Sequence, residues 1–246
     1  MINNPLIIAH RGASGHAPEN TMAAFRLAVE QAADWVELDV HQTADGHLVV
    51  LHDFTLQRTA GDPRPVRELT LEQVKKFDIG SWWDGTYQNE QVPTLDEVLA
   101  FANGRIRVFI EIKRGSPFYP AIERRLLETI ARHSAKDRVV ISSFDLAGLK
   151  TLRGLDPEIS LGLLTRKSRP REILNEAKSL KVQSIHISTH RLSKKFLPQA
   201  HANGLPVYVY TVNRLSLMKR YLALGVDGLF TNYPDRLRDL LRTEPL

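Results

Sequence analysis

The sequence predicts an α/β protein of the (β/α)8-barrel class, the TIM barrel, with a small insertion after the second strand region. Short apolar segments alternate with amphipathic segments along the whole chain, as parallel strands and their covering helices do. Roughly eight such units in 246 residues match the size of this barrel. A doubly wound sheet is the alternative, but no Gly-x-Gly-x-x-Gly turn follows the first apolar segment.

Strands are expected where apolar residues, many of them β-branched, gather over a few positions between turn residues. Side chains in a strand alternate between two faces, so each strand should turn one set toward the helices and the other toward the barrel interior. The expected strands are 6–10, 35–40, 47–52, 107–113, 138–144, 159–165, 182–188, 205–212 and 228–232.

Helices of about a dozen residues are expected between these strands, because the intervening segments repeat apolar residues at helical spacing. In segment 21–32, the side chains of Met22, Phe25 and Val29 fall on one face. Segment 120–133 repeats this spacing. Such helices would bury one face against the outside of the barrel.

Residues 54–92 interrupt the alternation. They are richer in turn residues and contain Trp82 and Trp83. Thr70 and Thr94 are followed three positions later by Gln and Glu, a capping-box spacing that predicts a helix start at each threonine. We expect residues 54–92 to form an insertion within a single barrel domain that spans residues 1–246.

The composition is typical of a folded globular protein, with 43% hydrophobic and 25% charged residues. No apolar stretch approaches the roughly 18 residues of a membrane span. The N-terminal segment lacks the basic region of a cleaved signal peptide, so we expect a cytoplasmic protein. The absence of cysteine excludes disulfides, thiol catalysis and cysteine-bound metals.

The formal net charge of +5 is unevenly distributed along the chain. Residues 1–123 hold 11 basic and 17 acidic residues, whereas residues 124–246 hold 22 and 11. The basic residues of the second half are dispersed over many segments, as on solvated helix faces, which argues against nucleic-acid binding. An anionic small-molecule substrate fits this charge at least as well.

Two carboxylates share one face of the second expected strand. Val36, Leu38 and Val40 form its apolar face, and Glu37 and Asp39 form the other. Carboxylates that point into a barrel repel each other and lose hydration. They therefore need a cation or an exposed strand end.

Glu111 repeats this pattern on the strand expected at 107–113. Together with Glu37 and Asp39, it would form a hard, oxygen-rich site suited to one divalent cation, Mg²⁺ or Ca²⁺. A structural ion pair is the alternative for a single carboxylate. Two strands that end in the same way favour the metal site.

His10 and His52 each follow an apolar segment, at the expected carboxyl end of a strand. Alternation places His10 on the face of Ile8 and His52 on the face of Val50, both pointing inward. Histidine exchanges protons near neutral pH, and barrel active sites lie at the carboxyl ends of the strands. These two histidines are therefore predicted to be catalytic. The remaining histidines receive no predicted role, including His41, which flanks the turn at 43–46.

Two cationic side chains accompany these groups. Arg11 directly follows His10, and Lys113 lies two residues beyond Glu111. Both can bind phosphate oxygens, Arg11 in a bidentate manner, although each could instead neutralise a neighbouring carboxylate. A cation site with two histidines and two fixed positive groups predicts phosphoryl transfer.

Short motifs that include these residues extend over nearly the whole chain, and their ordered set resembles the signature of the glycerophosphodiester phosphodiesterase family. The motifs are His10-Arg11-Gly12, Glu19-Asn20-Thr21, Glu37-Leu38-Asp39-Val40, His52-Asp53, Gly80-Ser81-Trp82, Val92-Pro93-Thr94-Leu95, Glu111-Ile112-Lys113, Ser142-Ser143-Phe144, Thr211-Val212-Asn213 and Asp227-Gly228 followed by Thr231-Asn232-Tyr233-Pro234-Asp235.

The resemblance implies hydrolysis of glycerophosphodiesters, small-molecule substrates such as glycerophosphocholine and glycerophosphoethanolamine, to sn-glycerol 3-phosphate and an alcohol. It implies a (β/α)8 barrel with an insertion after the His-Asp pair. It also implies the role of each site residue: His10 and His52 as the acid-base pair, Arg11 and Lys113 on the phosphate, and Glu37, Asp39 and Glu111 on one divalent cation.

Two positions depart from the family pattern. Tyr210 stands where members often have Trp, and Ala60 stands where many have a second Thr. Neither position belongs to the predicted metal or histidine sites, so both departures concern the shape of the substrate pocket.

Two other functions stay open. A lysophospholipase D would need an apolar entrance, which six aromatic residues could supply unless they pack the insertion onto the barrel: Phe54, Trp82, Trp83, Tyr87, Phe118 and Tyr119. A catalytically silent barrel that binds anionic partners through its basic half is the alternative from another class. It is disfavoured because every predicted catalytic position holds a competent residue.

Overall fold

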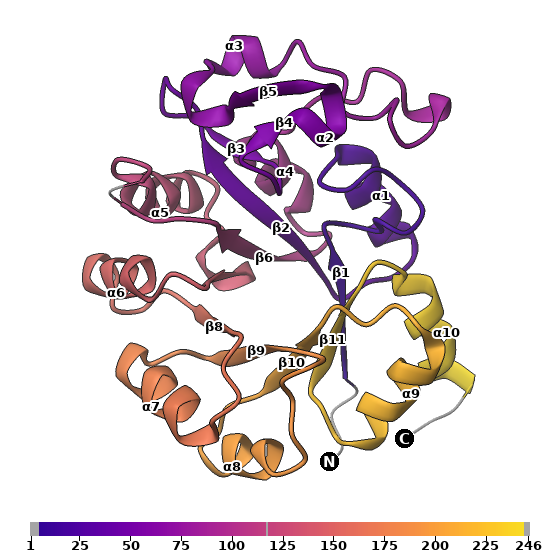
Figure 1. The fold of residues 1–246 in the computed structure, drawn as a ribbon, viewed down its shortest axis with the longest axis vertical. Helices are drawn as coiled ribbons and strands as arrows, with labels where there is room; N and C mark the ends of the chain where they lie inside the picture. Colours follow the sequence, from indigo (N-terminus) through magenta and orange to yellow (C-terminus); the bar gives the residue numbers. More distant parts are fainter. Residues whose placement is uncertain (1–4, 117, 244–246) are drawn as a thin grey trace.

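Eight parallel strands close into a barrel in the computed structural model, which describes residues 5–116 and 118–243. β1 pairs with β2 on one side and with β11 on the other, so the sheet has no open edge between them. The predicted barrel class is therefore confirmed (Figure 1). The barrel strands are β1 (Leu6–His10), β2 (Trp35–Gln42), β6 (Arg107–Ile112), β7 (Val139–Ser143), β8 (Leu161–Thr165), β9 (Ser184–Ser188), β10 (Val207–Tyr210) and β11 (Gly228–Thr231).

A ring of helices surrounds the strands (Figure 1). The helices expected within 21–32 and 120–133 are α1 and α5, and α5 buries the face that its spacing predicts. In α1, Phe25 of the predicted face is buried, whereas Met22 and Val29 are only partly buried against the core. Among the described residues, every helix is too short or too polar to cross a lipid bilayer. The surrounding helices are α1 (Met22–Glu30), α4 (Leu95–Ala102), α5 (Ile122–Arg132), α6 (Leu146–Leu155), α7 (Pro170–Leu180), α8 (Phe196–Ala202), α9 (Leu215–Ala223) and α10 (Pro234–Thr243).

The alternation of the barrel strands separates two apolar cores. Val36, Leu38 and Val40 of β2 belong to the larger core, which packs the sheet against the helices. Trp35 of the same strand belongs to a smaller core inside the barrel. There its ring lies 4.4 Å from that of Phe109, between ring centroids. This aromatic layer fills the barrel interior, so side chains further along each strand lie above it at the carboxyl ends.

One expected strand differs from the prediction. The segment expected at 47–52 forms β3 (Leu48–Val50), which pairs antiparallel with β2 and is not a barrel strand. The turn between them is too short for the crossover that a parallel pair requires. Val50 consequently packs in the outer core, so the inward alternation expected for His52 with Val50 is wrong. His52 instead lies beyond the end of β3.

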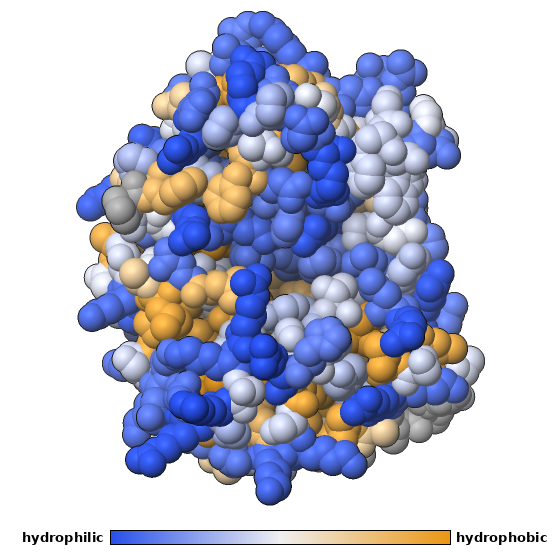
Figure 2. Space-filling model, viewed as in Figure 1, coloured by the Kyte–Doolittle hydropathy of each residue, from blue (hydrophilic) through white to orange (hydrophobic). Residues whose placement is uncertain are grey.

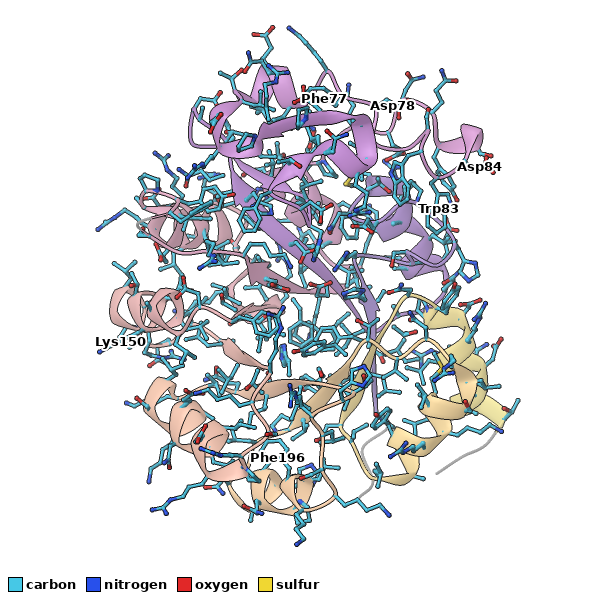
Figure 3. The ribbon with its side chains drawn as sticks, in the orientation of Figure 1. Phe77, Asp78, Trp83, Asp84, Lys150 and Phe196 are labelled. Atoms are coloured by element: carbon cyan, nitrogen blue, oxygen red, sulfur yellow. The ribbon has the colours of Figure 1, made fainter. Side chains whose placement is uncertain are left out.

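Residues 54–92 lie above the barrel in Figure 1 and pack around their own apolar cluster, which includes Leu56, Val66 and Val74. Phe77 packs against this cluster, and Figure 3 shows it with Asp78 at the upper edge of the molecule. The capping boxes predicted at Thr70 and Thr94 are both present. The segment contains β4 (Thr55–Leu56), α2 (Gln57–Ala60), β5 (Asp62–Pro65), α3 (Leu71–Val74) and the 3-10 turns η1 (Val66–Glu68) and η2 (Gly85–Tyr87).

Candidate active site

A cavity of about 880 Å³ opens at the carboxyl ends of the barrel strands. Figure 2 shows a hydrophilic hollow near the centre of this face. Six of the seven predicted site residues line the cavity: His10, Arg11, Glu37, His52, Glu111 and Lys113. The seventh, Asp39, is buried beneath Arg11 and Lys113 and contacts both of them.

The three predicted metal ligands lie together. Asp39 of β2 is in register with Glu111 of β6, and Glu37 precedes Asp39 on the same face. One carboxylate oxygen from each residue lies within 4.8 Å of the other two, and all three side chains are buried. Their donors are all hard oxygens, the type that Mg²⁺ and Ca²⁺ prefer, so these residues fit a divalent cation.

Both predicted cations contact these carboxylates. Lys113 Nζ lies 2.6 Å from an oxygen of Asp39 and 2.9 Å from an oxygen of Glu111. Arg11 Nε lies 3.3 Å from the other oxygen of Asp39, and its backbone N–H donates to Glu37 at 3.0 Å. Arg11 adopts a left-handed backbone with φ of 58°, which non-glycine residues rarely do. The Glu37 hydrogen bond helps hold that strained conformation.

The pKa values of the three acids are shifted in different directions by burial and by neighbouring charges. Burial, together with the charges of Asp39 and Glu111, raises the pKa of Glu37 well above its usual value. Burial and Asp39 raise the pKa of Glu111 to about 7. Burial also acts to raise the pKa of Asp39, but Lys113 and Arg11 outweigh it and lower that pKa. Two of the three acids are therefore short of compensating positive charge, which a divalent cation would supply.

His10 ends β1 and points into the cavity. Its Nδ1 lies 2.8 Å from the side-chain oxygen of Asn232. Because that oxygen can only accept, Nδ1 carries the proton and Nε2 is free to accept one. Burial, with the nearby charge of Arg11, lowers the pKa of His10 to about 3, so the ring is neutral at pH 7. Asn213 accepts a hydrogen bond from the backbone N–H of Asn232 at 2.8 Å and thereby orients it.

His52 enters the cavity from the loop after β3. Its Nδ1 lies 2.6 Å from a carboxylate oxygen of Asp53, whose other oxygen accepts from Arg58 Nε at 2.7 Å. Burial, with the charges of Lys113 and Arg11, lowers the pKa of His52, and the charge of Asp39 and the hydrogen bond to Asp53 oppose this effect. Arg58 also donates to Glu19, so the loop that carries His52 is tied to the segment after β1.

Asn20 and Glu19 lie near Asp39 and belong to a sequence motif, but the sequence predicted no role for them. Asn20 donates to Asp39 at 2.8 Å from a buried position. Like Arg11, it has a left-handed backbone, with φ of 57°. Glu19 accepts from the Arg11 guanidinium at 3.0 Å. Both residues therefore hold the groups that surround the carboxylates.

His41 supports the backbone of His52, a role that the sequence did not indicate. It is fully buried, with Nε2 at 3.1 Å from the backbone carbonyl oxygen of His52. Because a carbonyl only accepts, Nε2 donates and Nδ1 must accept, and Nδ1 lies 2.6 Å from the Tyr119 hydroxyl. Burial lowers the pKa of His41 to about 4, so the ring stays neutral. The hydrogen bonds from Tyr119 to His41 and from His41 to the His52 carbonyl thus fix the backbone of His52.

Replacing Tyr119 with phenylalanine should lower the free energy of unfolding by about 1–3 kcal/mol, because it leaves His41 Nδ1 buried without a donor. Chemical denaturation would measure the change. The matched control is Tyr233→Phe, since no hydrogen bond of the Tyr233 hydroxyl occurs among the residues described, and it should change stability by less than about 0.5 kcal/mol. Equal losses in both variants would contradict the assigned hydrogen bond.

Comparisons with known proteins identify the family. Residues 10–236 match the Glycerophosphoryl diester phosphodiesterase family. A glycerophosphodiester phosphodiesterase of Caldanaerobacter subterraneus subsp. tengcongensis is 38% identical over 238 residues, covering 96% of this chain and 98% of that protein. One from Bacillus altitudinis is 36% identical over 238 residues, covering 94% and 95%.

A solved structure extends the likeness to three dimensions. It is a phosphodiesterase from Oleispira antarctica in complex with the product sn-glycerol-3-phosphate. It matches this chain with a TM-score of 0.91 at 31% sequence identity and covers 97% of both chains. On the extent of the family match and the identity to these relatives, the chain belongs to the glycerophosphoryl diester phosphodiesterase family.

Proposed function

We propose that this protein hydrolyses glycerophosphodiesters to sn-glycerol 3-phosphate and an alcohol with the help of one divalent cation. The observation that carries the proposal is the convergence of two histidines and a buried carboxylate triad at one cavity. Family membership and the product named for the Oleispira antarctica neighbour support the substrate class. The test is release of glycerol 3-phosphate from glycerophosphoethanolamine by metal-loaded protein, and no release with any cation would overturn the proposal.

Glu37, Asp39 and Glu111 would hold the cation, Mg²⁺ or Ca²⁺. When bound, it supplies Lewis-acid neutralisation of the negative charge that develops on the phosphoryl oxygens. Arg11 and Lys113 line the same cavity and carry N–H donors, and we assign both to the phosphate. Their contacts with Asp39 and Glu111 support this assignment, because they hold both positive groups beside the proposed cation site.

His10 is the proposed base, because its neutral ring turns Nε2 toward the cavity while Asn232 holds Nδ1. It takes a proton from the nucleophile, which is water or the glycerol 2-hydroxyl. Attack by the 2-hydroxyl gives a cyclic phosphate, which water then opens to sn-glycerol 3-phosphate. As the new P–O bond forms, the P–O bond to the leaving alcohol breaks. His52, the proposed acid, gives its proton to that leaving oxygen. The negative charge of a bound phosphodiester would favour the protonated ring of His52.

We also propose that residues 54–92 and the barrel form a single domain that spans the chain. A backbone hydrogen bond supports this, because the N–H of Ala44 donates to the carbonyl of Leu69 at 2.8 Å. The insertion and the second strand region therefore share a main-chain contact.

The alternative of a lysophospholipase D depends on the aromatic residues near the entrance. Phe54 lines the cavity and is 40% exposed, but its ring packs edge-on against His41 and Phe118. Trp82 and Trp83 pack against each other. Because these rings contact one another, they favour the packing role and a deacylated substrate. Faster turnover of lysophosphatidylethanolamine than of glycerophosphoethanolamine would reverse this preference.

Metal activation should depend on pH in the direction set by Glu111. Its pKa of about 7 means that it holds a proton at lower pH, which a cation must displace. The metal concentration for half-maximal activity should therefore rise about tenfold when the pH falls from about 8 to about 6. Glu111→Gln carries no such proton and should show a flatter pH dependence. A wild-type activation constant that is independent of pH would contradict this assignment.

A further inference from the structure

The part of the cavity lined by Arg114, Phe144, Asp145 and Arg166, called the outer part below, contains two arginines that the proposed reaction does not use. Arg114 follows Lys113 after β6, and Arg166 follows β8, so they lie on either side of β7. Both side chains are exposed, and both line the cavity. Within residues 5–116 and 118–243, neither forms an ion pair with a carboxylate. Their charges are therefore available to a ligand in the cavity.

A contact with an aromatic ring holds Arg166 in place and does not neutralise its positive charge. Its guanidinium carbon lies 4.3 Å from the centroid of the Phe144 ring, in cation–π geometry. Phe144 packs edge-on against Tyr210, whose hydroxyl donates to the carbonyl of Thr165 at 2.9 Å. Because Arg166 occupies a face of Phe144, that face is closed to a ligand ammonium group. This arrangement disfavours binding of choline or ethanolamine at the ring of Phe144.

Asp145 is the carboxylate among the described residues that line this outer part, and it is already neutralised by backbone donors. One oxygen accepts from the N–H groups of Ala147 and Gly148 at 3.0 and 3.3 Å, as the N-cap of α6. The other oxygen accepts from the N–H of Gly115 at 3.1 Å. Backbone N–H groups and the helix dipole thus compensate this negative charge. The two arginines leave the outer part with an excess of positive charge.

We propose that this outer part binds an anionic group on the alcohol that leaves the phosphate. The inference rests on the proposed function and specifies its substrate class: glycerophosphodiesters whose alcohol itself carries a phosphate or a carboxylate. Arginine forks bind either group in a bidentate manner. The volume of about 880 Å³ lies near the upper end of the usual range for ligand sites, which leaves room beyond the reacting phosphate.

A matched pair of substrates tests the inference. Glycerophosphoglycerol and its terminal phosphate monoester differ only in the second anionic group, and glycerophosphoglycerate supplies a carboxylate instead. The wild-type kcat/KM should be at least about tenfold higher for an anionic alcohol than for the neutral one. Comparison of the phosphate-bearing substrate with the carboxylate-bearing substrate shows which anion the protein prefers. Arg114→Gln and Arg166→Gln should each lower this ratio several-fold, mainly through KM.

Lys150→Gln is the matched control for loss of one positive charge. Lys150 is exposed on α6 and points away from the barrel in Figure 3. Its substitution should leave the ratio unchanged, whereas an equal effect would show that net charge alone matters. A wild-type preference for neutral or choline-bearing substrates would overturn the inference while leaving the proposed function intact. Failure to cleave any glycerophosphodiester would overturn the proposed function itself.

Discussion

Replacement of His10 with alanine is expected to lower kcat by about 10²–10⁴-fold, the usual contribution of a positioned acid or base. The ring ends β1, faces the cavity and is oriented by Asn232 at 2.8 Å. His52→Ala should produce a loss of the same order, because its ring lines the same cavity. Steady-state release of glycerol 3-phosphate measures both losses.

The fold of these variants has to remain intact for this result to be informative. Circular dichroism and thermal unfolding would establish that the barrel persists. His190→Ala is the matched control, since His190 is exposed and outside the cavity lining, and it should keep kcat within about twofold of wild type. Activity within tenfold of wild type in folded His10→Ala would contradict its role as the base.

Replacement of Glu37 or Glu111 with glutamine is expected to weaken metal binding by about tenfold or more. Each change keeps the shape of the side chain but removes one of the three charges that would attract the cation. The reason is electrostatic, since these acids crowd within 4.8 Å and gain most from a divalent partner. The metal concentration for half-maximal activity measures the effect.

The exposed residue Glu128 of α5 provides a control for the loss of one negative charge. Glu128→Gln should leave the metal titration unchanged. Unchanged metal titrations in Glu37→Gln and Glu111→Gln would remove both residues from the metal site. A loss of thermal stability without a change in the titration would point instead to structural ion pairs with Arg11 and Lys113.

The barrel and much of its interior could be predicted from local sequence. In β2 and β6, a period of two places Val36 and Val108 toward the helices and Glu37 and Glu111 inside, as observed. That inference succeeds because neighbouring barrel strands enforce the same alternation. The family and the phosphodiesterase class predicted from the ordered motifs are also confirmed.

The prediction that Val50 and His52 both point into the barrel was wrong because β3 pairs in the opposite direction. An apolar segment predicts a strand, but the direction of its pairing depends on the length of the connection and on its neighbours. β3 returns antiparallel to β2 after a short turn, so Val50 joins the outer core. His52 reaches the cavity because of the loop that follows, a placement that alternation could not supply.

The groups that orient His10 and His41 could not be predicted, because their contacts are remote in sequence. Asn232 lies 222 residues from His10, and Tyr119 lies 78 residues from His41. Such pairs follow from barrel closure and helix crossovers, which bring the ends of distant strands together. The burial of His41 is likewise a tertiary property that a single sequence does not specify.

The most direct test of the account uses metal-stripped protein and glycerophosphoethanolamine. Release of glycerol 3-phosphate should be absent after stripping, return on addition of Mg²⁺ or Ca²⁺, and remain absent in metal-loaded His10→Ala. This outcome would tie the reaction, the carboxylate triad and the base to one cavity. Full activity of the stripped protein, or full metal-restored activity of His10→Ala, would contradict it.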